Sequence, residues 1–171
     1  MTIVIFGGGG DLTHRKLLPA LYNLHVDGLL PPGIAIVGVG RKEMTDDAYR
    51  EFAKDGVTQF SRRPIDEAAW QTFAASLFVV AAEIESEKGL APLGARLDII
   101  EHERNLTGDR IYYLALPSSL FVPTVKRLQQ ARFVTRGEGP AARIIVEKPI
   151  GNDLTSACAI NDAIADVFDE P

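Results

Sequence analysis

The stretch TIVIFGGGGDLTHRKLLPALYNL, residues 2–24, decides the fold of this chain. It begins with five residues typical of a buried strand, passes through four consecutive glycines and continues into a basic segment with helical character. Ordering a glycine costs more backbone entropy than ordering any other residue, so four in a row need a physical reason. We expect something to approach the backbone of this turn closely.

Four more stretches are as short and β-branched as the first strand, as buried parallel strands tend to be. We expect strands at 2–6, 34–39, 76–81, 110–116 and 142–147. Helices are expected at 11–26, 45–60, 66–75, 90–104, 118–133 and 153–168. This alternation predicts an α/β fold: a doubly wound, Rossmann-like parallel sheet in the strand order 3-2-1-4-5, with helices on both faces.

Composition narrows the class of protein. With 171 residues, of which 46% are hydrophobic, the chain has the size of one domain with one good core. Its 18 basic and 23 acidic residues give a net charge of -5, which argues against a general nucleic-acid or membrane-surface binder. The lone Cys158 excludes an internal disulfide and a cysteine-based metal cluster, and no metal site is expected. We find no membrane-spanning or secretory segment and predict a cytoplasmic protein.

The first and last helices carry specific expectations. Pro19 lacks an N–H and crowds the carbonyl of Arg15, so the helix at 11–26 should bend or break there. In the last helix, helical spacing places apolar residues on one face, so we expect Cys158 to be a core residue. That face comprises Leu154, Ala157, Cys158, Ile164, Ala165 and Phe168.

The glycine run suggests a phosphate site. A strand that leads through a glycine turn into a helix offers free N–H groups and the positive end of the helix dipole. The Gly-x-Gly-x-x-Gly fingerprint is met only in part, because Gly7 and Gly9 fit but Leu12 takes the third place. No Gly-Lys-Ser/Thr comes after it, so the sequence does not match the P-loop motif of mononucleotide sites either. A tight turn without a ligand is the alternative at this point.

The end of the second expected strand favours NADP as the ligand. An acidic residue there suits the free ribose of NAD, whereas a basic one suits a 2′-phosphate. This chain has Arg41 and Lys42 at that place. The alternative is that both are solvated loop cations, partly offset by Glu43.

Three motifs in order resemble the amino-terminal part of the glucose-6-phosphate dehydrogenase family. GGGGDLTHRKLLPALYNL (7–24), with GLLPPGIAIVGVGRKEMTDDAYR (28–50) after it, resembles the region of the family signature Gly-x-x-Gly-Asp-Leu-Ala/Thr-x-x-Lys-x-x-Pro. RIYYLALPSSLF (110–121) resembles its Tyr-Leu-Ala-Leu/Thr-Pro-Pro segment, and RIIVEKPIGNDLTSA (143–157) its Glu-Lys-Pro stretch. The resemblance spans the whole chain.

The resemblance implies a set of site residues. Its cofactor-binding positions correspond here to Gly7, Gly8, Gly9, Gly10, Asp11, Leu12, Arg41, Lys42, Leu116, Pro117 and Lys148. Lys16 and Lys148 correspond to positions that contact the substrate, glucose 6-phosphate. Gly9 replaces a frequent Ser or Thr that helps to bind the 2′-phosphate, so NAD is possible beside NADP.

The resemblance also implies a function for the longer enzyme. Its members oxidise glucose 6-phosphate to the lactone by hydride transfer to NADP, a step of the pentose phosphate pathway. The substrate domain and the catalytic histidine, in the motif Arg-Ile-Asp-His-Tyr-Leu-Gly-Lys, are absent from these residues, as are most subunit contacts of the homo-oligomer. We therefore expect residues 1–171 to be a catalytically incomplete dinucleotide-binding domain. The alternative is a free-standing, non-catalytic NAD(P)-binding regulatory domain.

Overall fold

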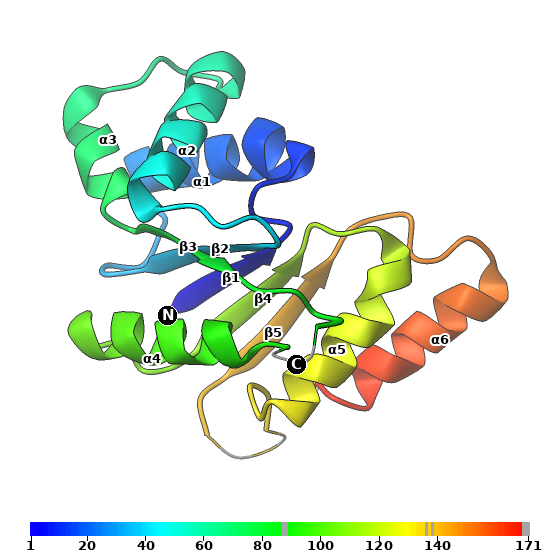
Figure 1. Cartoon of the computed structure of the whole chain (residues 1–171). Coiled ribbons are helices and arrows are strands. Elements are labelled where there is room, and N and C mark those ends of the chain that lie inside the picture. Colours follow the sequence, from blue (N-terminus) through cyan, green and yellow to red (C-terminus); the bar gives the residue numbers. More distant parts are fainter. Residues whose placement is uncertain (87–88, 136, 138, 169–171) are drawn as a thin grey trace.

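A computed structural model describes residues 1–171 except 87–88, 136, 138 and 169–171. Its five strands form one parallel sheet in the order β3-β2-β1-β4-β5 (Figure 1). The strands are β1 (Thr2–Phe6), β2 (Ala35–Gly40), β3 (Leu77–Ala81), β4 (Arg110–Leu114) and β5 (Ala142–Val146). The predicted fold class and strand order are confirmed.

Helices lie on both faces of the sheet (Figure 1). They are η1 (Thr13–Leu17), α1 (Leu18–Val26), α2 (Asp46–Phe60), α3 (Glu67–Ala74), α4 (Ala91–Glu103), η2 (Ser118–Leu120), α5 (Phe121–Gln130) and α6 (Leu154–Ala165). Helices α1, α2 and α3 bury Tyr22, Ala53 and Phe73 on one face. Helices α4 and α5 bury Leu97 and Val125 on the other. None of the described helices is long and apolar enough to span a bilayer.

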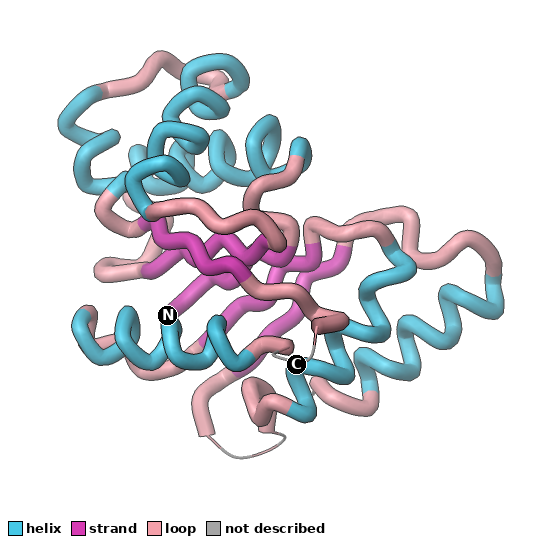
Figure 2. The backbone as a smooth tube through the Cα atoms, viewed as in Figure 1, coloured by secondary structure: helices cyan, strands magenta, loops and turns pink. Residues whose placement is uncertain are grey.

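The strand register brings the ligand-binding edge together. Phe6 at the end of β1 lies opposite Val39 of β2 and Leu114 of β4. The loops after these strands therefore start at the same level, at one edge of the sheet (Figure 2). Chain connections run in opposite directions from β1 and β4, which is where doubly wound sheets bind ligands.

The first helix changes type where a break was predicted. Residues 13–17 form the π-helical turn η1, and the α-helix starts at Leu18 with Pro19 in its first turn. In the π-helical turn the N–H groups bond five residues back, as that of Leu18 does to Thr13, and Pro19, which has no N–H, comes directly after this wider turn. The expected bend or break at Pro19 thus takes the form of a change of helix type within a continuous helical stretch.

The prediction that Cys158 is a core residue is wrong, because its side chain is exposed in the structure. Leu154, on the same expected inward face, is 80% exposed. Helix α6 packs against α5 and buries Ile160 instead, while Phe168 beyond its end is also buried. Apolar side chains lie on more than one side of this helix, so spacing alone could not tell which side is covered.

Candidate cofactor-binding site

A cavity of about 780 Å³ opens at the carboxyl edge of the sheet. Seven of the predicted cofactor-binding residues line it, namely Gly7, Gly9, Gly10, Arg41, Lys42, Leu116 and Pro117. Its other walls come chiefly from the ends of β2 and β3, namely Val39, Gly40, Met44, Tyr49, Val79, Ala82, Glu83, Ile84 and Glu85. Its volume is that of a site for a cofactor-sized molecule.

Two glycines of the turn are required by close backbone contacts. A Cβ on Gly7 would lie 2.2 Å from the carbonyl oxygen of Ala115, and Gly7 has a positive φ of 88°. A Cβ on Gly8 would lie 2.4 Å from the Cα of Gly38. No larger residue fits either place without moving the backbone, so these glycines seat the turn on the ends of β4 and β2.

The turn leaves one N–H group for a ligand. The amides of Gly7 and Gly8 both donate to the carbonyl of Val39, at 2.9 Å each, and that of Gly10 donates to the carbonyl of Gly7 at 2.9 Å. Within the described residues the Gly9 N–H has no hydrogen-bond partner, and a Cβ there would meet nothing within 4 Å. Gly9 is therefore the glycine whose backbone faces open space, as phosphate binding requires.

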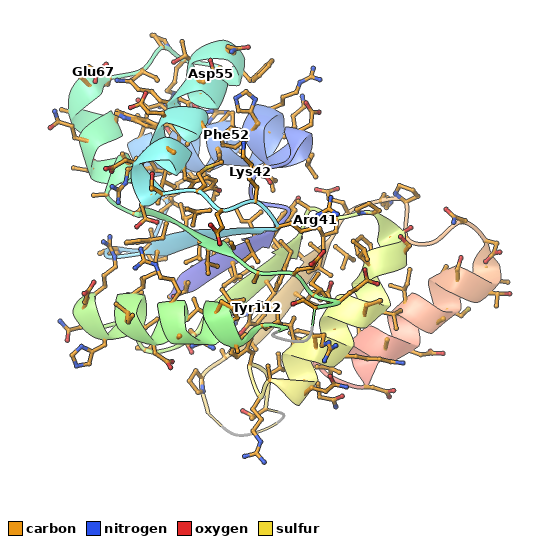
Figure 3. The ribbon with its side chains drawn as sticks, viewed as in Figure 1. Arg41, Lys42, Phe52, Asp55, Glu67 and Tyr112 are labelled. Atoms are coloured by element: carbon orange, nitrogen blue, oxygen red, sulfur yellow. The ribbon has the colours of Figure 1, made fainter. Side chains whose placement is uncertain are left out.

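Arg41 and Lys42 come directly after β2 (Figure 3), and both line the cavity. Both are exposed, and neither forms an ion pair with Glu43 or with any other described residue. Two free cations beside an unpartnered backbone N–H suit a ligand that carries several phosphates. Glu83 and Glu85 also line this cavity, which the sequence did not indicate.

Three predicted cofactor residues of the glycine turn and the start of the helix after it do not line the cavity, namely Gly8, Asp11 and Leu12. Gly8 lies on the side of the turn that packs against β2. The exposed carboxylate of Asp11 lies 3.6 Å from Arg15, one helical turn away. An anion at this place would repel a phosphate, so any contribution of Asp11 must come from its backbone.

The two lysines predicted to contact the substrate lie outside the cavity. Lys16 belongs to η1, and Lys148 comes after β5 at the carboxyl edge, joined to Pro149 by a cis peptide bond. Both side chains are exposed, and the described residues provide neither with an ion pair. Tyr113 donates a hydrogen bond to Glu147, the residue that could have offset the charge of Lys148.

Comparison with known proteins agrees with this geometry. Residues 4–171 match the family described as glucose-6-phosphate dehydrogenase, NAD binding domain. The chain belongs to this family. Glucose-6-phosphate 1-dehydrogenase of Dickeya dadantii is 38% identical over 168 residues, which are 98% of this chain and 32% of that enzyme. That of Chlamydia pneumoniae is 34% identical over 171 residues, 98% of this chain and 33% of the enzyme.

Solved structures of the family have the same fold. A glucose-6-phosphate dehydrogenase in complex with its substrate glucose 6-phosphate superposes with a TM-score of 0.82 at 32% identity, covering 98% of this chain and 34% of the other. The enzyme of Mycobacterium avium gives a TM-score of 0.81 at 30% identity with the same coverage. The chain thus spans about a third of the length of the relatives that it matches.

Tyr49 forms part of the cavity wall, although the sequence did not single it out. Its side chain is fully buried, and its hydroxyl has no hydrogen-bond partner in the described part of the chain. Burial raises the pKa of this hydroxyl above its usual value, so it stays protonated. A Cβ on Gly38 would lie 2.6 Å from this hydroxyl, so the glycine on β2 makes room for the ring.

The three histidines of this family member have helical surroundings. His14 bonds to Asp55 at 2.8 Å and His25 to Thr72 at 2.8 Å, in each case bridging two helices, while His102 is exposed. None is among the described residues that line the cavity. All three therefore belong to helices, namely η1, α1 and α4.

Proposed function

We propose that residues 1–171 form the NADP-binding domain of an enzyme that oxidises glucose 6-phosphate to 6-phosphogluconolactone. Family membership supports the class of enzyme, since the relatives that match along 98% of the chain are glucose-6-phosphate 1-dehydrogenases. The observation that supports NADP as the cofactor is the position of Arg41 and Lys42 in the same cavity as the open Gly9 amide. Both cations are free of ion pairs in the described chain.

The charges give the proposed orientation of the cofactor. The pyrophosphate lies at the glycine turn, where the Gly9 N–H and the start of η1 face it. The 2′-phosphate lies against Arg41 and Lys42, which form charge-assisted hydrogen bonds with it. The bound nicotinamide accepts the hydride from the sugar. Gly9 offers no side-chain hydroxyl to the 2′-phosphate, so we expect NAD to bind as well, though more weakly.

Lys16 and Lys148 serve the substrate in this proposal. The described residues give neither lysine an ion pair, so both charges are free for the phosphate of glucose 6-phosphate. Tyr113 holds Glu147 by a hydrogen bond, and Glu147 forms no ion pair with Lys148 in the described chain. Lys148 keeps its second proposed role, a contact with the cofactor.

Residues 1–171 are proposed to bind the cofactor without turning it over. Hydride transfer needs a base within hydrogen-bond reach of the sugar hydroxyl, and no histidine of the described chain lies in the cavity. The cytoplasmic location, the absence of nucleic-acid and membrane partners, and a homo-oligomer formed through the rest of a longer enzyme stay predictions. A free-standing regulatory domain is not favoured, because the matching relatives are enzymes.

The test is a calorimetric titration of the chain with NADP and NAD in the same salt. We expect NADP to bind more tightly, and Arg41→Ala to weaken NADP by about 10- to 100-fold, the loss of roughly 1.5 to 3 kcal/mol for a hydrogen bond to a charged group. NAD binding should change little. Arg143→Ala is the control, because Arg143 is exposed on β5 and does not line the cavity. An equal loss for both cofactors would contradict the assignment of Arg41.

A further inference from the structure

One peptide group of the glycine turn is held at both ends. It joins Gly7 to Gly8. Its N–H donates to the carbonyl of Val39 at 2.9 Å. Its carbonyl oxygen accepts two hydrogen bonds, from the Gly10 amide at 2.9 Å and from the hydroxyl of Thr13 at 2.8 Å. A peptide plane fixed at its donor and its acceptor cannot rotate without breaking these bonds.

Thr13 supplies the bond in this group that comes from a side chain. It is fully buried, begins η1 and reaches back six residues to Gly7. Within the described chain, no other side chain hydrogen-bonds to residues 7–10. Valine has nearly the same shape as threonine but no hydroxyl, so it would leave the Gly7 carbonyl with one partner in place of two.

The next peptide group along the chain is the one that faces the ligand. It joins Gly8 to Gly9, and among the amides of residues 7–10 its N–H is the one without a partner in the described chain. A Cβ on Gly9 would meet nothing within 4 Å, so no atom on that side of the residue holds it in place. The direction of its N–H therefore depends on the clamped peptide group before it, because the two groups share the Gly8 Cα.

We propose that Thr13 is a positioning residue for the cofactor. Its hydroxyl, through the Gly7 carbonyl, fixes the turn so that the Gly9 N–H points at the pyrophosphate before the cofactor arrives. This inference rests on the proposed function, in which a dinucleotide occupies the cavity. Binding to a site that is already arranged avoids the entropy cost of ordering it, so loss of the hydrogen bond from Thr13 to the Gly7 carbonyl weakens cofactor binding.

The effect of Thr13 has a signature that separates it from Arg41. NADP and NAD share the pyrophosphate and differ in the 2′-phosphate. A residue that acts through the pyrophosphate amide must weaken both cofactors by the same factor and leave their ratio unchanged. A residue that contacts the 2′-phosphate changes the ratio.

The experiment is a calorimetric titration of three variants of residues 1–171 with NADP and with NAD. Thr13→Val should weaken both cofactors by about 3- to 10-fold, the range for one neutral hydrogen bond. Thr13→Ser keeps the hydroxyl and should bind like the unmodified chain. Thr2→Val is the matched control, because Thr2 is equally buried and its hydroxyl donates to Glu101 at 2.9 Å, at the opposite edge of the sheet. It should lower stability without changing affinity.

Each outcome bears on the proposal. Unchanged affinity in Thr13→Val overturns it, and so does an equal loss in Thr13→Ser, because the cause would then be packing. A changed ratio of NADP to NAD affinity overturns it in favour of a 2′-phosphate contact. If Thr13→Val does not fold, Thr13→Ala replaces it with the same expected loss. Failure of the unmodified chain to bind either cofactor would instead contradict the proposed function, because Thr13 would then have no cofactor to position.

Discussion

The backbone of Gly8 lies against that of Gly38, so closely that a Cβ on Gly8 would be 2.4 Å from the Gly38 Cα. On its other side, Gly38 meets the ring of Tyr49, 2.6 Å from the place of its own absent Cβ. Turn, strand β2 and helix α2 thus meet at two glycines. Gly8 is needed for this packing, since its φ is not among the positive values.

We expect Gly8→Ala to lower the free energy of unfolding by about 1 to 3 kcal/mol, the usual cost of inserting an atom into a packed place. Gly9→Ala is the matched change one residue along, where a Cβ meets nothing within 4 Å, and should stay within about 0.5 kcal/mol of the unmodified chain. Urea unfolding followed by circular dichroism measures both. Equal effects of the two changes would contradict the packing argument.

Most of the fold could be predicted because it depends on local pattern. The β-branched runs at 2–6 and 34–39 predict buried parallel strands, and both appear within a residue of the expected bounds. Pro19 marked the place where the first helix changes type. These features are set by residues close together in the chain, which is what a sequence displays.

The rest depends on contacts between distant residues. Nothing in a run of four glycines says that Gly7 and Gly8 seat the turn while Gly9 faces the cavity, because Ala115 and Gly38 decide it. The place of Glu83 in the cavity wall was not predicted, because no phosphate-site motif includes this residue. The exposed Cys158 was misjudged because neighbours select which apolar side of α6 is covered.

Gly9→Thr should increase the preference for NADP over NAD. The open space at Gly9 accommodates a side chain, and a hydroxyl there would add a donor for the 2′-phosphate. One hydrogen bond to a charged group is worth about 1.5 to 3 kcal/mol, so a gain of roughly 10-fold or more in NADP affinity is expected. Gly9→Val is the control without the hydroxyl. A gain in Gly9→Val as well would show that the hydroxyl is not the cause.

Glu101 makes the stability of the domain depend on pH. It accepts hydrogen bonds from Arg110 at 2.9 and 2.7 Å and from Thr2 at 2.9 Å. Burial alone would raise the pKa of Glu101, but the hydrogen bonds and charge of Arg110, with the bond from Thr2, outweigh it and hold this pKa below its ordinary value. A lowered pKa in the folded state stabilises the fold above the unfolded pKa, and this contribution is lost as pH falls through the folded one.

Glu101→Gln should therefore lower the free energy of unfolding at pH 7 by roughly 1.5 to 3 kcal/mol, the value of a hydrogen bond to a charged group. The difference in unfolding free energy from the unmodified chain should shrink below about pH 4. Urea unfolding at a series of pH values measures it. Glu67→Gln is the surface control, because Glu67 (Figure 3) is exposed and forms an ion pair with Lys54 at 3.2 Å. Its cost should not exceed about 1 kcal/mol. A constant difference across pH would contradict the role of Glu101.

Tyr49 and Tyr112 give opposite predictions for the same change. Both rings are fully buried, but the hydroxyl of Tyr49 has no partner in the described chain, whereas that of Tyr112 donates to the carbonyl of Phe133 at 3.1 Å. A buried hydroxyl without a hydrogen bond costs about 1 to 3 kcal/mol, and a satisfied one contributes about 0.5 to 1.5 kcal/mol. Tyr49→Phe should therefore raise the free energy of unfolding, and Tyr112→Phe should lower it.

Unfolding in urea, with and without NADP, measures the two tyrosine variants. Without cofactor the signs of the two changes should differ. With saturating NADP, an unchanged gain from Tyr49→Phe means that the hydroxyl has no contact with the cofactor. A smaller gain in unfolding free energy in the presence of NADP means that the bound cofactor supplies the missing hydrogen-bond partner, since Tyr49 belongs to the cavity wall. A loss of stability in Tyr49→Phe without cofactor would contradict the prediction, because it would show that the hydroxyl already has a partner in the protein.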